Sequence, residues 1–170
     1  MKILFTLVLS GLMWGAGSLS DETLTQTTDM QDSFPAVCLI GDNEEEIDKL
    51  SVQHEKLLLS VCEDDMNVAY DKWMSMLQEM EVYAETINYD IRGVKLWLNV
   101  YWNEDGSIRQ ISFFPKPRSR NIENKELIAF FKGFMKRYRL PLSSDVKFAH
   151  YGMALFPTFA KAGLKAQNRP

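Results

Sequence analysis

The chain has 170 residues, of which 46% are hydrophobic, 25% charged and 12% aromatic, with a formal net charge of −4. This length leaves room for one domain with a helical appendage, and the composition excludes a chain that is disordered throughout. The charge is unevenly distributed: residues 21–65 hold thirteen acidic residues and two lysines, whereas residues 66–170 hold ten acidic and sixteen basic residues. This asymmetry predicts two parts of different character.

Residues 1–18 have the pattern of a secretory signal peptide. Lys2 supplies the positive start, an apolar run follows over residues 3–14, and Ala16, Gly17 and Ser18 form a small-residue cleavage pattern. The apolar run is shorter than the roughly 20 residues that span a bilayer. We therefore expect a cleaved signal and a periplasmic or secreted protein. An uncleaved signal that anchors the chain in the inner membrane is the alternative.

The polar, acidic residues 19–42 show no apolar period and predict a flexible tether. Cys38 and Cys62 make an even number of cysteines in a chain that is expected to be exported. They predict a disulfide that closes a loop of about 25 residues. Two reduced, buried thiols are the alternative.

A helical region is expected over residues 43–91. Apolar side chains recur at helical spacing in two stretches that the acidic residues 63–65 separate, and Gly93 follows the second stretch. The pattern predicts an N-terminal helical hairpin. His54 falls on the apolar side of the first helix, where a packed core residue is more common than a ligand.

Alternation of apolar and polar residues predicts a strand over residues 94–102 and a second strand after Asp105 and Gly106. These two residues suit a two-residue type I′ turn, which needs a positive φ at both positions. The resulting register pairs Leu98 with Phe113, Val100 with Ile111 and Trp102 with Arg109. The last pair is expected to form a cation–π contact.

A helix is expected from about residue 121 or 124 to Pro141, followed by a third strand over residues 147–156 and a disordered tail over 160–170. The predicted fold class is α+β. It comprises the helical hairpin and, over residues 92–159, a domain in which a β-hairpin, a helix and a strand form a three-stranded antiparallel sheet.

Four motifs in residues 93–159 follow one another in a specific order: a glycine before the first strand, DGSI at the hairpin, RYRLPL at the end of the helix and FPTF at the end of the last strand. In this order the segment resembles the C-terminal domain of TonB-type energy transducers. The resemblance implies that the last strand is a sheet edge that pairs with an extended peptide from an outer-membrane receptor. The Pro-rich spacer of the transducers is missing here, and the helical region stands in its place.

The sequence thus predicts an exported, non-catalytic envelope protein that binds a protein or peptide partner by strand addition. A structural or accessory protein whose edge is covered by residues 43–62 or by the tail is the alternative, and a protein that binds a small ligand is a further one. By the resemblance, the partner-binding edge comprises His150, Tyr151, Gly152, Met153, Ala154, Leu155 and Phe156.

Known catalytic and metal-binding motifs such as HExxH, GxSxG and the P-loop do not occur in the sequence. The candidates for catalysis are His54, His150 and scattered carboxylates, which match none of these motifs, so no catalytic site, metal site or cofactor is expected. A basic patch is expected to meet an anionic surface, or else to be the solvated face of a helix and its preceding loop. Its residues are Lys116, Arg118, Arg120, Lys136, Arg137 and Arg139. Export argues against nucleic acid as the partner.

Overall fold

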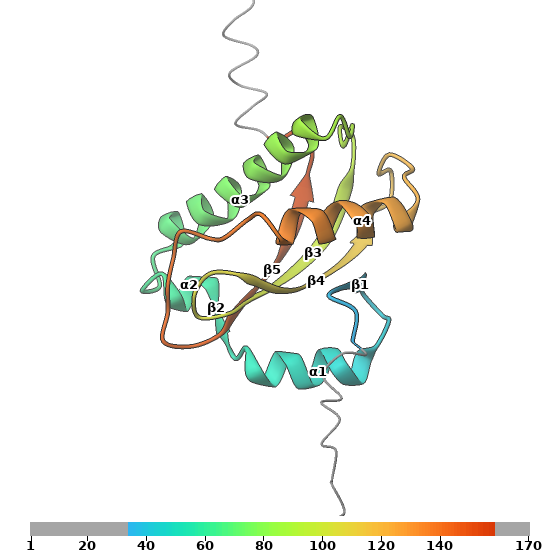
Figure 1. Ribbon diagram of the computed structural model, residues 1–170. Helices are drawn as coiled ribbons and strands as arrows, with labels where there is room; N and C mark the ends of the chain where they lie inside the picture. Colours follow the sequence, from blue (N-terminus) through green and yellow to red (C-terminus); the bar gives the residue numbers. More distant parts are fainter. Residues whose placement is uncertain (1–33, 159–170) are drawn as a thin grey trace, which may run out of the picture. The chain divides into compact units, whose positions relative to one another are not determined.

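The structure is a computed structural model that describes residues 34–158. The expected signal peptide, most of the tether and the tail lie outside the described residues. Figure 1 shows the elements, which all belong to the compact unit Gln31–Pro170. In chain order they are β1 (Val37–Leu39), α1 (Glu44–Gln53), β2 (Lys56–Leu57), α2 (Leu58–Val61), α3 (Met66–Thr86), β3 (Lys95–Trp102), β4 (Ile108–Pro115), α4 (Asn124–Met135) and β5 (Phe148–Leu155).

One five-stranded sheet has the strand order β1-β4-β3-β5-β2. The central strand β3 is antiparallel to both β4 and β5, whereas the two short outer strands are parallel to their neighbours. The predicted α+β class and the order hairpin, helix, strand are confirmed. The sheet is nevertheless mixed and five-stranded, not three-stranded and antiparallel, because β1 and β2 add a strand at each edge. With three and two residues, they are too short to show the alternation by which strands are recognised in a sequence.

The main core lies between the sheet and the helices α3 and α4, on what we call the inner face (Figure 1). Leu96, Leu98 and Val100 of β3 point to this face and are fully buried. They pack with apolar residues of the two helices, such as Met76 of α3 and Phe131 of α4. The alternation predicted for β3 is therefore confirmed on this face.

The opposite, outer face of the sheet is covered only in part. Leu50 of α1 packs against Tyr101 and Ala149, together with the partly buried Phe34. This small cluster covers the end of the outer face at which β3 finishes and β5 begins. The other end carries no helix among the described residues, and this difference creates the candidate site described below.

The helical hairpin predicted over residues 43–91 is only half correct. Its second helix is α3, which the Asp65 carboxylate caps by accepting hydrogen bonds from the N–H groups of Asn67 (2.8 Å) and Val68 (3.2 Å). The first helix ends at Gln53, and the chain then adds Lys56 and Leu57 to the sheet as β2. Pairing with β5 satisfies backbone groups that a continuous helix would satisfy internally, so tertiary context overrides the helical spacing.

The hairpin register is confirmed at Leu98–Phe113 and Val100–Ile111 but is wrong at Trp102, which pairs with Ile108. A β-bulge lies at this point and leaves the neighbouring residue of β4, Arg109, without a partner on β3.

The predicted cation–π contact is therefore also wrong. Trp102 is fully buried and stacks on Phe148, with ring centroids 5.3 Å apart, whereas Arg109 is exposed.

The turn of the hairpin also differs from the predicted type I′ turn. The Gly106 N–H donates to the Asn103 carbonyl (3.0 Å), and Gly106 has a φ of 78°, whereas Asp105 is not among the described residues with a positive φ. This geometry is that of a type I turn followed by a glycine bulge, the usual three-residue hairpin loop.

Cys38 and Cys62 are free, buried thiols, and the predicted disulfide is not formed. Cys38 lies in β1 and Cys62 directly follows α2, next to β2, so the two residues are at opposite edges of the sheet. Four strand spacings separate those edges, about 19 Å, whereas the Cα atoms of a disulfide lie within about 7 Å of each other. The tether prediction also fails for residues 37–39, which form β1.

Candidate functional site

The last strand, β5, has one side that is open along most of its length. On its other side, β5 pairs with β3 over all eight residues without a register shift. The Phe156 N–H, just after β5, donates to the Val94 carbonyl (3.0 Å). On the other side of β3, the Lys116 N–H, just after β4, donates to the Lys95 carbonyl (2.8 Å). Since hydrogen-bonded and non-hydrogen-bonded pairs alternate in antiparallel sheets, the even-numbered residues of β5 bond to β3.

The odd-numbered residues of β5 consequently direct their N–H and C=O groups away from the sheet. β2 pairs with β5 only at Phe148 and Ala149. From there on, Tyr151, Met153 and Leu155 have no strand partner among residues 34–158 on the side away from β3. We call these three residues the open edge.

The open edge refines the site predicted from the sequence. Of the seven predicted residues, His150, Gly152 and Ala154 use their backbone groups to hold β3. Phe156 lies beyond the end of β5, is buried and also bonds to the residue before β3. The alternative of an edge covered by residues 43–62 is realised in part: β2 pairs with the first two residues of β5, and α2 also contacts this strand.

Large apolar side chains are exposed on the outer face beside this edge. Trp97 of β3 is flanked in register by Phe114 of β4 and Met153 of β5, and Tyr151 lies next in line on β5. Each of the four is 45–51% exposed. We call these four residues the open sheet face. Lys116 lies over Trp97, with Nζ 3.8 Å from the ring centroid, and places a positive charge at one end of the face.

Gly152 does not serve the close approach of a partner, as its position in the predicted edge had suggested. A Cβ at Gly152 would lie 3.0 Å from the ring of Trp73 and 3.0 Å from the ring of His150. Trp73 belongs to α3, on the inner face. The glycine therefore accommodates the packing of α3 on β5.

The two histidines pack against aromatic side chains in this fold. His54 is buried, its Nδ1 is 2.7 Å from the Leu50 carbonyl, and its ring meets Tyr101 edge-on. His150 packs on Trp73, with ring centroids 4.4 Å apart. Burial lowers the pKa of both imidazoles, so the neutral form is favoured.

The predicted basic patch is divided between the two ends of α4, which are about 18 Å apart for a helix of 12 residues. At the N-terminal end, Lys116 covers Trp97, Arg118 is exposed and Arg120 pairs with Asp90 at 2.9 Å. At the other end, Arg137 lies over Tyr83, Arg139 pairs with Asp105, and Lys136 is exposed. The six residues do not form one continuous surface.

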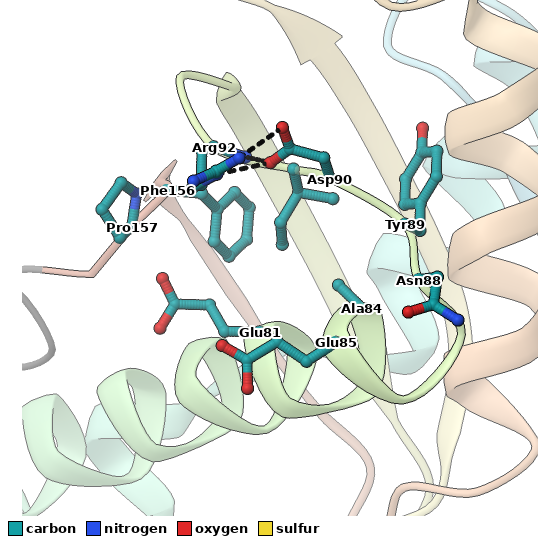
Figure 2. A pocket seen from close by; sticks show the side chains of 10 residues that line it. Glu81, Ala84, Glu85, Asn88, Tyr89, Asp90, Arg92, Phe156 and Pro157 are labelled. Carbon is teal, nitrogen blue, oxygen red and sulfur yellow. Dashed lines mark hydrogen bonds and ion pairs between the residues drawn. The ribbon is translucent and has the colours of Figure 1, made fainter.

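A pocket of about 370 Å³, which the sequence did not indicate, lies between α3, residues 88–92 and Phe156 (Figure 2). Its buried Glu81 carboxylate accepts hydrogen bonds from the N–H (2.6 Å) and the hydroxyl (3.0 Å) of Thr158. Asp90 accepts two hydrogen bonds from the Arg92 side chain, which lower the pKa of its carboxyl group. Glu81 thus ties Thr158, which follows β5, to α3, whereas Asp90 pairs with Arg92 of the same loop and with Arg120.

Among residues 34–158, no group of three or more His, Cys, Asp or Glu side chains is arranged to hold a metal ion. None of the helices in that range is long and apolar enough to cross a membrane. Comparison of the chain with protein-family models, with curated proteins and with solved structures found no match.

Proposed function

We propose that the protein is an exported, non-catalytic envelope protein that binds an extended segment of a partner protein by strand addition at the open edge. The observation that carries this proposal is the coincidence of unpaired backbone groups at Tyr151, Met153 and Leu155 with the exposed apolar side chains of the open sheet face. In β-augmentation the backbone groups supply affinity, and the alternate side chains supply specificity.

The open edge lacks the features with which proteins protect sheet edges against unwanted pairing. Residues 150–155 include no proline, lysine, aspartate or glutamate, and the register of β5 with β3 is continuous. The opposite edge is different, because β1 has only three residues and follows Pro35 closely. An unprotected edge beside exposed aromatic side chains supports the presence of a partner.

The partner segment that fits this site is extended, with apolar side chains at alternate positions. Every second side chain of an added strand would lie over the outer face, next to Tyr151 and Met153. A carboxylate near the end of the segment would be attracted to Lys116 and Lys95, which flank Trp97. An outer-membrane receptor segment, the partner implied by the TonB-type resemblance, is one source of such a peptide.

The test uses two substitutions of the same residue. Met153→Pro removes an N–H that points away from β3, so the sheet keeps its internal hydrogen bonds while strand addition is blocked. Met153→Ala keeps this N–H and removes only the side chain. A library of short random peptides would be selected on the immobilised full chain, and the affinity of the selected peptides would then be measured by fluorescence anisotropy.

We expect Met153→Pro to abolish peptide binding and Met153→Ala to weaken it only severalfold, with both variants folded by circular dichroism. Failure to select any peptide, or equal binding by the proline variant, contradicts strand addition.

Hydrogen exchange measured by NMR tests the same site without a ligand. The N–H groups of Tyr151, Met153 and Leu155 are expected to exchange fast, and those of Gly152 and Ala154 slowly, because only the latter pair with β3. Uniform protection along β5 would instead favour the accessory protein with a covered edge.

A further inference from the structure

A second pocket, of about 470 Å³, lies near the β1 edge of the sheet, which is the edge opposite to β5 and β2. Residues 34–36 before β1, the beginning of β4 and the last turn of α4 surround it. It shares no residue with the open edge or the open sheet face. Its volume is within the range of about 300–1,000 Å³ that is usual for small-molecule sites.

Three basic side chains line this pocket: Arg109 of β4, Lys132 of α4 and Lys136 at the end of α4. No acidic residue is among its lining residues. All three are exposed, and none of them forms an ion pair within the part of the chain that the structure describes. We call them the cation triad.

The position of Arg109 depends on the β-bulge in β4. Tyr101 pairs with Gln110 and Trp102 with Ile108, so Arg109 is the extra residue of the bulge. Bulges change the direction of a side chain and occur preferentially beside functional sites. Arg109 therefore has no partner on β3, and its side chain lines the pocket together with the two lysines.

The remaining lining of the pocket is apolar. It consists of Phe34, Ala36, Ile108 and Met135. The segment that carries the first two is held in place, because the side-chain amide of Gln110 donates to the Pro35 carbonyl (2.8 Å) and the Ile111 N–H donates to the Ala36 carbonyl (3.0 Å). The pocket thus combines an ordered apolar wall with three positive charges.

We propose that this pocket binds a small anionic amphiphile, with a carboxylate or phosphate at the cation triad and a hydrocarbon or aromatic body against the apolar wall. Lysines near the C-terminus of a helix also interact favourably with the helix dipole, and this accounts for Lys132 and Lys136. The helix dipole does not explain why Arg109, at the bulge of β4, also lines the pocket, and it does not explain the apolar wall. Charge complementarity from three separate positions therefore favours an anionic ligand.

The probe for the test is dodecyl phosphate below its micelle concentration, titrated into the full chain by calorimetry. Two further arms use inorganic phosphate, which has the headgroup alone, and dodecanol, which has the tail alone. A fourth arm uses vesicles of anionic phospholipid in a sedimentation assay. We expect one molecule of dodecyl phosphate to bind at least tenfold more tightly than either fragment, because the pocket holds both parts of the ligand.

Arg109→Gln is expected to weaken the binding of dodecyl phosphate about tenfold, the loss typical of one charge-assisted hydrogen bond. Its matched control is Lys49→Gln, which removes one exposed positive charge from α1, away from the pocket. Met135→Gln should reduce the advantage of dodecyl phosphate over inorganic phosphate. Since all three side chains are at least partly exposed, the variants are expected to fold, and circular dichroism verifies this.

Three results would overturn the proposal. The first is the absence of saturable binding of dodecyl phosphate. The second is an equal loss of binding in Arg109→Gln and Lys49→Gln, which would show a dependence on net charge alone. The third is sedimentation with anionic vesicles without binding of the monomeric amphiphile, which would show attraction to a charged membrane surface.

Discussion

The tip of the β3–β4 hairpin offers a sharp test of the structure at Gly106. Gly106 has a φ of 78°, and a Cβ at this position would lie 2.3 Å from the carbonyl oxygen of Leu140 and 2.8 Å from that of Leu142. Both obstacles are backbone atoms, so Gly106→Ala requires the segment after α4 to move. The Gly106 carbonyl also accepts a hydrogen bond from the Leu140 N–H (2.9 Å), which such a movement would weaken.

The expected destabilisation is the sum of two effects. A positive φ costs an L-residue about 1–2 kcal/mol. Displacing the Leu140 backbone loses a hydrogen bond worth about 1 kcal/mol and disturbs the packing of Leu140, which is 2% exposed. We therefore expect Gly106→Ala to lower the free energy of unfolding by about 3 kcal/mol. For a chain of this size, this corresponds to a fall in Tm of about 10 °C.

Gly41 provides the matched control, since it has a φ of 99° but a Cβ at this position would have no atom within 4 Å. Gly41→Ala should therefore show the cost of the positive φ alone, about 1–2 kcal/mol. Urea unfolding of both variants, followed by tryptophan fluorescence, measures the difference. Equal destabilisation by the two substitutions would refute the close approach of the hairpin tip to residues 140–142.

Three further predictions concern the core, the thiols and the histidines. Val100→Asp is expected to unfold the protein, because Val100 is fully buried and the carboxylate would have no partner; an unchanged melting curve would show that the faces of β3 are misassigned. Cys38 and Cys62 should react slowly with iodoacetamide in the native protein, because burial raises the pKa of both thiols. After denaturation without a reductant, both thiols should react fully. A protein mass two daltons below that of the dithiol form would contradict this prediction. Burial lowers the pKa of His54 and His150, so the unfolded chain takes up protons first and stability should fall as the pH drops below about 6.5. Tm measured between pH 7 and pH 5 should vary less in a double glutamine variant, and an identical pH dependence would rule out both imidazoles as the cause.

Long elements with a regular period could be predicted from the sequence. The helix α3 has 21 residues, and its apolar side chains repeat at helical spacing over its whole length. In β3 the residues Leu96, Leu98 and Val100 stand at alternate positions, so its inner face follows directly from the pattern. In these segments the local preference and the tertiary packing agree.

Elements that depend on distant partners could not be predicted in this way. β2 consists of Lys56 and Leu57, both exposed, within a stretch that has helical spacing. Only its pairing with Phe148 and Ala149 makes it a strand. The bulge at Arg109 likewise has no local signature, because it is defined by the register of two strands.

The candidate site was predicted in part for a related reason. The resemblance to TonB-type domains implied that β5 is a sheet edge. Which of its backbone groups are open follows only from the hydrogen-bond pattern between β5 and β3. Exposure of Trp97 could not be foreseen either, because Tyr101, on the same face of the same strand, is buried under α1. Leu50 of α1 packs on Tyr101, whereas Trp97 is not part of that cluster and stays exposed.

The two proposed sites lie on opposite sides of β3, and this separation makes each proposal a control for the other. Met153 belongs to β5, and the pocket with Arg109 lies between β4, α4 and the residues before β1. Met153→Pro should therefore leave the affinity for dodecyl phosphate unchanged, and Arg109→Gln should leave the affinity for the selected peptides unchanged. Were either substitution to impair both kinds of binding, a general loss of structure would explain the result better than two separate sites.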